Sequence, residues 1–110
     1  MRKFNIGDII FVYYYNNKSR LNDDPKFVRL NRNNLVNHWR GKCMTQYFII
    51  NGEKIRTFTY GNVGGPFSTI VRLDEENAII VSDSLTTARG RINAEYRRRE
   101  KNFWKNLKKK

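Results

Sequence analysis

The chain has a single cysteine, Cys43, among its 110 residues. One cysteine cannot form an intramolecular disulfide, so the sequence does not fit the small secreted domains that disulfides hold together. We therefore expect a cytoplasmic protein, associated with the nucleoid if it binds DNA. No run approaches the roughly 18 to 20 apolar residues that a membrane span requires, and no small-residue cleavage site follows the apolar stretch near the N-terminus. We expect neither a signal peptide nor a membrane partner.

Residue types that carry out catalysis are also scarce. His38 is the only histidine, and with no cysteine or acidic neighbour it indicates neither a metal site nor a general base. Sequences typical of nucleotide-binding loops, zinc sites and nucleophile elbows are absent. We predict a protein that is not an enzyme, with no catalytic residue, no bound metal and no cofactor.

Acidic residues are few as well, and the resulting excess of positive charge is unevenly distributed along the chain. The chain holds 22 Lys and Arg against 10 Asp and Glu, a formal net charge of +12. Residues 89–110 contain 10 of the basic and 2 of the acidic side chains, a net charge of +8, while residues 1–88 hold 12 and 8, a net charge of +4. Such a field attracts polyanions, of which nucleic acid is the commonest. The C-terminal segment is therefore the first candidate for a binding surface.

Upstream of that segment the pattern is typical of β-structure. Asn51-Gly52 is the pair best suited to the positive φ angles of a type I′ turn, so it predicts a tight hairpin. Residues 31–41 are rich in Asn and predict a loop. The fold class we predict is mainly β (α+β), a small SH3-like antiparallel barrel of five or six strands with a C-terminal basic amphipathic helix. The expected barrel-like domain is 1–84, the helix is 85–110, and the strands lie in 9–15, 26–30, 44–60, 67–73 and 78–82.

After residue 82 the apolar residues follow a helical period. Asp83 or Ser84 can cap a helix, and Gly90 is expected to interrupt it, so that the firm helix begins near Arg91. Arg99 falls within the apolar stripe although it is charged. The stripe covers roughly 100° of arc, should anchor the helix to the barrel, and consists of Leu85, Ala88, Ile92, Tyr96, Phe103 and Leu107.

Basic side chains occupy the opposite side of this helix. Each Lys or Arg that neutralises a phosphate releases condensed counterions, which gives affinity without sequence preference. We predict binding of nucleic acid, with double-stranded DNA favoured over RNA. Lys54 and Arg56 should extend the surface onto the sheet, and the helical members are Arg91, Arg97, Arg98, Lys101, Lys105 and Lys108.

Aromatic residues on the expected strands have two interpretations. Rings such as those of Tyr14 and Tyr47 can stack on unpaired bases if the sheet leaves them open. Aromatic residues at strand positions more often form core or cross-strand pairs.

The opening Phe4-Asn5-Ile6-Gly7-Asp8-Ile9-Ile10-Phe11-Val12 resembles the start of SH3-like barrels, including KOW-type nucleic-acid-binding domains. The resemblance implies a small barrel with a nucleic-acid partner. Small basic proteins with this opening and a lysine-rich end also look like phage early proteins that coat or remodel host DNA, which implies a role in host takeover.

Two other functions remain open. The same opening is similar to that of MazF-type toxins, which are barrel ribonucleases, and that likeness implies an endoribonuclease with Arg29 and Thr69 as the nearest candidates for its reacting groups. The basic helix can also dock on an acidic host protein as an inhibitor. The sequence does not indicate an oligomeric state.

Overall fold

The computed structural model describes residues 3–18, 23–57 and 66–108, and for residues 103–108 it describes the backbone only. The molecule is elongated, with principal extents of 53 × 27 × 27 Å. Seven antiparallel strands precede one helix in the described residues, which confirms a mainly β chain with a C-terminal helix. The elements are β1 (Ile9–Asn16), β2 (Lys26–Arg29), β3 (Leu35–Arg40), β4 (Cys43–Ile50), β5 (Glu53–Arg56), β6 (Ser68–Arg72), β7 (Asn77–Ser82) and α1 (Leu85–Lys108).

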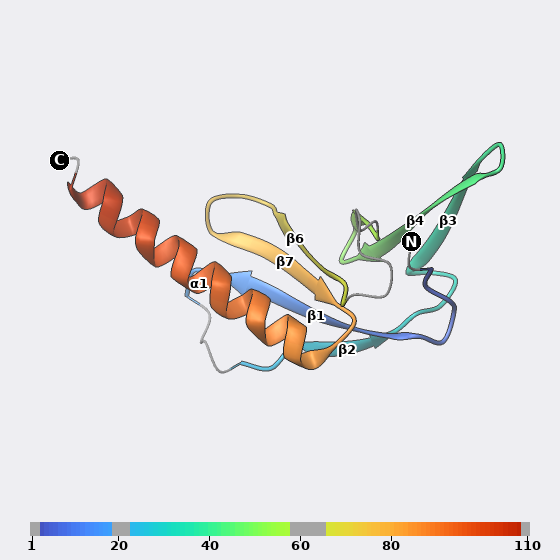
Figure 1. Ribbon diagram of the computed structural model, residues 1–110, viewed down its shortest axis with the longest axis horizontal. Helices are drawn as coiled ribbons and strands as arrows, with labels where there is room; N and C mark the ends of the chain where they lie inside the picture. The colour runs from blue at the N-terminus through green and yellow to red at the C-terminus, as the bar shows by residue number, and fades with distance from the viewer. Residues whose placement is uncertain (1–2, 19–22, 58–65, 109–110) are drawn as a thin grey trace.

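The strands form two separate sheets. Sheet A has the order β2-β1-β7-β6, and sheet B has the order β3-β4-β5. No pairing closes either sheet on itself among the described strands, so the predicted five- or six-stranded barrel is not found there. Figure 1 shows β3 and β4 at one end of the molecule and the C-terminal end of α1 at the other.

Sheet A is the middle layer of the fold because β1 and β7 bury both of their faces. Successive side chains of a strand point to opposite faces. Ile10 and Val12 of β1 therefore join the core shared with sheet B, whereas Tyr13 and Tyr15 join a second core beneath α1. The nearly continuous apolar sequence of these strands follows from this double burial.

The sharpest local prediction was the hairpin at Asn51-Gly52, and it is confirmed. These two residues have φ angles of 50° and 80°, as a type I′ turn requires. Beyond the turn, Ile55 is buried and Arg56 is exposed, because successive side chains of a strand point to opposite faces. Residues 58–60, the end of that predicted strand, lie outside the described part of the chain.

The prediction of a loop over residues 31–41 was wrong for the second half of the segment. Leu35–Arg40 forms β3, which pairs with β4 along its whole length, from Leu35↔Phe48 to Arg40↔Cys43. Only Leu35 is buried in β3. A strand without alternating burial carries no alternating sequence signal, and it forms because β4 supplies its hydrogen bonds.

The helix α1 begins at a capped N-terminus. Ser84 is the capping residue, and its Oγ accepts a hydrogen bond of 3.1 Å from the backbone N–H of Thr87. The predicted break at Gly90 was wrong, because Leu85–Lys108 is one helix. The conformational cost of glycine, about 1 kcal/mol, is offset by burial of Ala88 and Ile92 on either side of it.

Candidate nucleic-acid interface

One side of α1 packs against β1, β6 and β7 of sheet A. Ala88 and Ile92 are fully buried there. The ring centroids of Tyr96 and Tyr15 lie 4.9 Å apart, and the hydroxyl groups of Tyr96 and Tyr13 are 3.4 Å apart. Three members of the predicted apolar stripe therefore anchor the helix. Leu85 contributes less to this anchoring, since it is 38% exposed.

Glu95 also lies on this side of α1, at 3% exposure. Its carboxylate accepts hydrogen bonds from Arg72 of β6, at 2.9 Å and 3.3 Å, and from Nε of Arg99, at 2.8 Å. Burial alone would raise the pKa of Glu95, but the hydrogen bonds and charges of Arg72 and Arg99 outweigh it and lower that pKa. The buried carboxylate is therefore ionised at neutral pH and ties the helix to the edge strand of sheet A.

The contacts of Arg99 account for the position of a charged residue in the apolar stripe. Its guanidinium lies over the Tyr15 ring, 4.4 Å from the centroid. It donates hydrogen bonds to the carbonyl oxygen of Glu75, at 2.8 Å, and to the side chain of Asn17. Arg99 is thus part of the contact between helix and sheet and is not available to a ligand in the way its neighbours are.

The exposed side of α1 carries three of the predicted binding residues. Arg97, Arg98 and Lys101 are all exposed. Arg98 is 3.7 Å from Glu95 but 52% exposed, so this ion pair is weak. Lys105 and Lys108 belong to the helix, and their side chains lie outside the described part of the structure.

Arg91 differs from the other predicted helical cations. It is half-buried, and its Nε has no hydrogen-bond partner in the described structure. A half-buried guanidinium reaches a phosphate less readily than an exposed one. We therefore assign the exposed helical surface to Arg97, Arg98 and Lys101, hereafter the helical patch.

Lys54 and Arg56 lie on β5 of sheet B, whereas α1 packs on sheet A. The prediction that they extend the helical patch onto the sheet beside α1 was therefore wrong. Both are exposed, and they flank Tyr47, because Arg56 is its cross-strand partner and Lys54 Nζ lies 4.2 Å from its ring centroid. The half-buried Tyr47 ring is partly covered by Lys54, which favours cross-strand pairing over base stacking.

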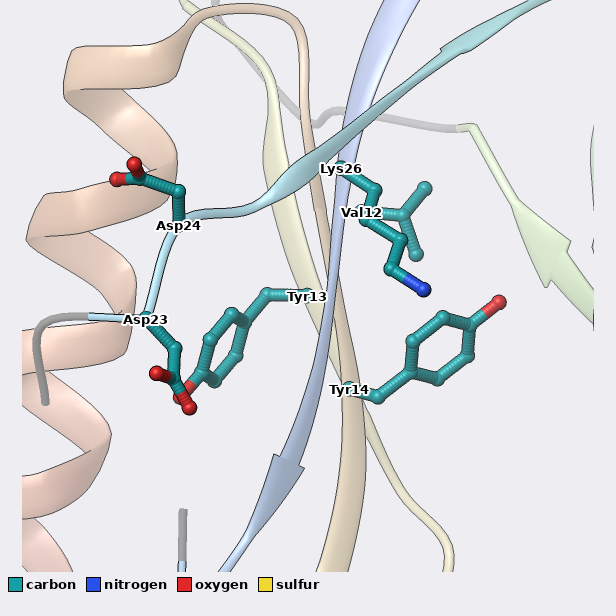
Figure 2. A pocket seen from close by; sticks show the side chains of 6 residues that line it. All are labelled: Val12, Tyr13, Tyr14, Asp23, Asp24 and Lys26. Atoms are coloured by element: carbon teal, nitrogen blue, oxygen red, sulfur yellow. The ribbon is translucent and has the colours of Figure 1, made fainter. Parts of the chain in front are cut away.

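A surface hollow of about 430 Å³ lies between β1 and the residues that precede β2. In Figure 2, Tyr13 and Asp24 point toward α1 and the Asp23 carboxylate lies beside the Tyr13 hydroxyl, while Tyr14 and Lys26 lie on the other side of β1. Asp24 forms an ion pair with Arg89 of α1. Two carboxylates at one end of the hollow repel phosphate, so the hollow does not extend the cationic surface.

The described residues bring together no reacting groups that we can assign. Arg29 is on β2 and Thr69 on β6, the opposite edges of sheet A. Two strands separate them, or roughly 14 Å at the usual strand spacing. Across residues 3–18, 23–57 and 66–108 no three His, Cys, Asp or Glu side chains gather where a metal ion would fit, and no helix in these ranges has the length and hydropathy of a membrane span.

No known protein family, curated protein or solved structure shows a significant match to the chain. Sequence reasoning identified the cations of α1 but missed the buried Glu95, which lies four residues before Arg99. Glu at i and Arg at i+4 is a spacing that brings opposite charges together on one side of a helix, and it was the signal that could have found this pair.

Proposed function

We propose that this protein binds double-stranded DNA through phosphate contacts, with low sequence preference and without catalysing a reaction. The observation that supports the proposal most is the division of α1 into two sides. One side is attached to sheet A through Ile92, Glu95 and Tyr96. The other presents the helical patch to solvent.

Attachment of the helix matters for the energetics of binding. Cations held on a docked helix need not be ordered when the ligand binds, so less conformational entropy is lost. Residues 85–108 hold eight Lys and Arg against Glu95 and Glu100, and Glu95 is occupied by Arg72 and Arg99. The remaining excess of positive charge favours phosphate. The resemblance of residues 4–12 to SH3-like nucleic-acid-binding domains points to the same partner and stays a prediction.

The proposal is tested by the salt dependence of affinity for a duplex of about 20 base pairs, measured by fluorescence anisotropy. If about six phosphates are engaged, log K should fall against log salt with a slope of roughly −5. The variant Arg97→Ala/Arg98→Ala/Lys101→Ala should reduce the slope to between about −2 and −3 and weaken binding to unrelated sequences equally.

A matched variant separates position from net charge. Lys18→Ala/Lys26→Ala/Arg32→Ala also removes three exposed cations, but none lies on α1, so its slope should stay close to that of the unmodified protein. An affinity for DNA that does not change with salt would contradict the proposed mechanism. Recovery of an acidic protein partner that survives nuclease treatment, together with no DNA binding, would favour the inhibitor alternative. Cleavage of RNA by the purified protein would favour the ribonuclease alternative.

A further inference from the structure

The hairpin of β3 and β4 extends beyond the rest of sheet B. Among the described residues, which do not include 58–65, β5 pairs with the last four residues of β4, from Tyr47↔Arg56 to Ile50↔Glu53. The backbone N–H of Thr57 also donates a hydrogen bond of 3.1 Å to the carbonyl oxygen of Gln46. In the same described part of the chain, residues 43–45 of β4 pair with β3 alone. Residues 38–45, hereafter the arm, are therefore a two-stranded ribbon, and Figure 1 shows it pointing away from the body of the molecule at the end opposite the C-terminus.

The arm is open to solvent on both faces. Each residue from Val36 to Arg40 is exposed, and Trp39 reaches 61%. Residues paired across antiparallel strands share a face, so Arg40 and Cys43 lie on one face of the arm together with His38 and Thr45. Trp39 and Met44 share the other face.

The arm and the chain around it carry charge of one sign. Residues 31–52 contain three cations and no Asp or Glu, and two of these cations, Arg40 and Lys42, belong to the arm. Both are exposed. A projecting ribbon without acidic groups attracts phosphates along its length and has no carboxylate that would repel them.

We propose that the arm enters the major groove of B-form DNA, with the face of His38, Arg40 and Cys43 toward the base edges and Lys42 on a phosphate. The inference rests on the proposed function and adds a second contact to it, at the other end of the molecule from the helical patch. The major groove is about 12 Å wide and admits a two-stranded ribbon, whereas the minor groove is only about 6 Å wide. The arm is a ribbon of two strands, so the major groove is the one that accommodates it.

The same dimensions distinguish DNA from RNA. The major groove of an A-form RNA helix is deep and narrow, and side chains do not reach its bases. The helical patch attracts the phosphates of either duplex, but the arm is accommodated only by the DNA. The arm therefore gives a physical reason for a preference for B-form DNA over duplex RNA.

Cys43 allows a test without any substitution in the chain. It is the sole cysteine and is exposed on the arm, so its rate of alkylation by a maleimide reports on that face. A saturating DNA duplex of about 20 base pairs should slow alkylation at least tenfold. An RNA duplex of the same length, at concentrations that give equal occupancy by anisotropy, should slow it less than twofold.

A pair of variants supplies a second measurement. Arg40→Ala/Lys42→Ala should make the salt slope for duplex DNA shallower by about 0.9, since Lys42 is the phosphate contact of the arm and each such contact contributes about 0.9, and should leave the slope for duplex RNA unchanged. The control Lys18→Ala/Lys26→Ala removes the same charge away from both the arm and the helical patch, and its slope for DNA should not change.

The outcomes separate this inference from the proposed function. If DNA binds through the helical patch but Cys43 reacts at its original rate, the arm is not in a groove and only the present inference is overturned. If no duplex binds at any salt concentration, the proposed function and the present inference are both contradicted. Protection of Cys43 that appears without nucleic acid as the protein concentration rises would show that the arm docks on a second copy of the chain, which also overturns the inference.

Discussion

Glu95 of α1 and Arg72 of β6 form a bidentate ion pair across the boundary between the helix and sheet A. The distance is 2.9 Å from Arg72 Nη2 to Glu95 Oε2 and 3.3 Å from Arg72 Nε to Glu95 Oε1. Glu95 is 3% exposed and Arg72 is 43% exposed. The pair therefore joins a buried anion on the helix to a cation that still contacts solvent, and with Arg99 it sets the rotation of α1 about its axis.

Replacing Glu95 by Gln should destabilise the fold. Breaking a fully buried ion pair costs about 3 to 5 kcal/mol, and the solvent around Arg72 reduces this, so we expect the free energy of unfolding to fall by about 2 kcal/mol at pH 7. Urea denaturation measures it. Glu100→Gln, an exposed position on the same helix, is the control and should change stability by less than about 0.5 kcal/mol.

The effect of Glu95→Gln should depend on pH. Because the pKa of Glu95 is lowered in the folded state, its contribution to stability is present above the unfolded value and is lost as the pH falls through the folded value. The difference between the variant and the unmodified protein should therefore shrink below about pH 4.5, the ordinary glutamate value. Asp74, whose pKa is lowered by the side-chain hydrogen bond from Asn77, remains in both proteins and shifts both curves alike. A difference that stayed constant down to pH 2 would mean that the carboxylate charge is not what stabilises the contact.

Arg97→Ala and Arg99→Ala should affect different properties although the two residues lie close together on α1: the first should weaken DNA binding and the second should destabilise the fold. Arg97 is exposed on the helical patch, so its removal should leave the unfolding free energy within about 0.5 kcal/mol and make the salt slope for DNA shallower by about 0.9. Arg99 holds Glu95, the Glu75 carbonyl and the Tyr15 ring, so its removal should cost about 2 kcal/mol of stability. Circular dichroism in urea and anisotropy titration give the two quantities. Equal losses of stability in both variants would place Arg97 in the fold and not in the interface.

Alkaline pH should weaken the contact between α1 and sheet A through Tyr96. Burial, with the hydrogen bond to Tyr13, raises the pKa of Tyr96 above the ordinary value of 10.0. A raised folded-state pKa means that the contribution is complete below pH 10 and is lost as the pH rises beyond it. The unmodified protein should therefore lose stability above about pH 10, and Tyr96→Phe should lose less over the same interval. Burial raises the pKa of Tyr15 as well, so the stability of Tyr96→Phe should still fall somewhat at alkaline pH. Parallel curves for the two proteins up to pH 12 would contradict the assignment.

Gly90→Ala should stabilise the protein. An added Cβ at Gly90 meets no atom within 4 Å, and alanine is favoured over glycine inside a helix by about 1 kcal/mol. We expect the free energy of unfolding to rise by up to that amount in urea denaturation. Gly52→Ala is the matched control, since a Cβ there is equally uncrowded but φ is +80°, and it should destabilise by about 1 kcal/mol. A stability loss in Gly90→Ala would mean that the helix needs glycine at this position.

Local sequence predicted those elements whose structure depends on neighbours along the chain. The turn at Asn51-Gly52 formed as expected because two adjacent residues adopt positive φ. The cap at Ser84 likewise depends on atoms three residues apart. β3 was missed because five of its six residues are exposed, so no periodic burial marked it. The barrel was predicted from the number of short strands, and strand number does not determine which strands pair.

The sequence by itself determined the excess of positive charge, its concentration in residues 89–110, and the helical period that gives this segment two sides. Only the tertiary structure decided which arginines belong to which side, because the surroundings of a side chain are set by strands distant along the chain. Arg99 contacts the Glu75 carbonyl and the Tyr15 ring, while Arg97, two residues earlier, is exposed to solvent. In the same way β5 pairs with half of β4 in the described part of the chain, and the length of this pairing, which the turn at Asn51-Gly52 does not set, leaves the arm exposed.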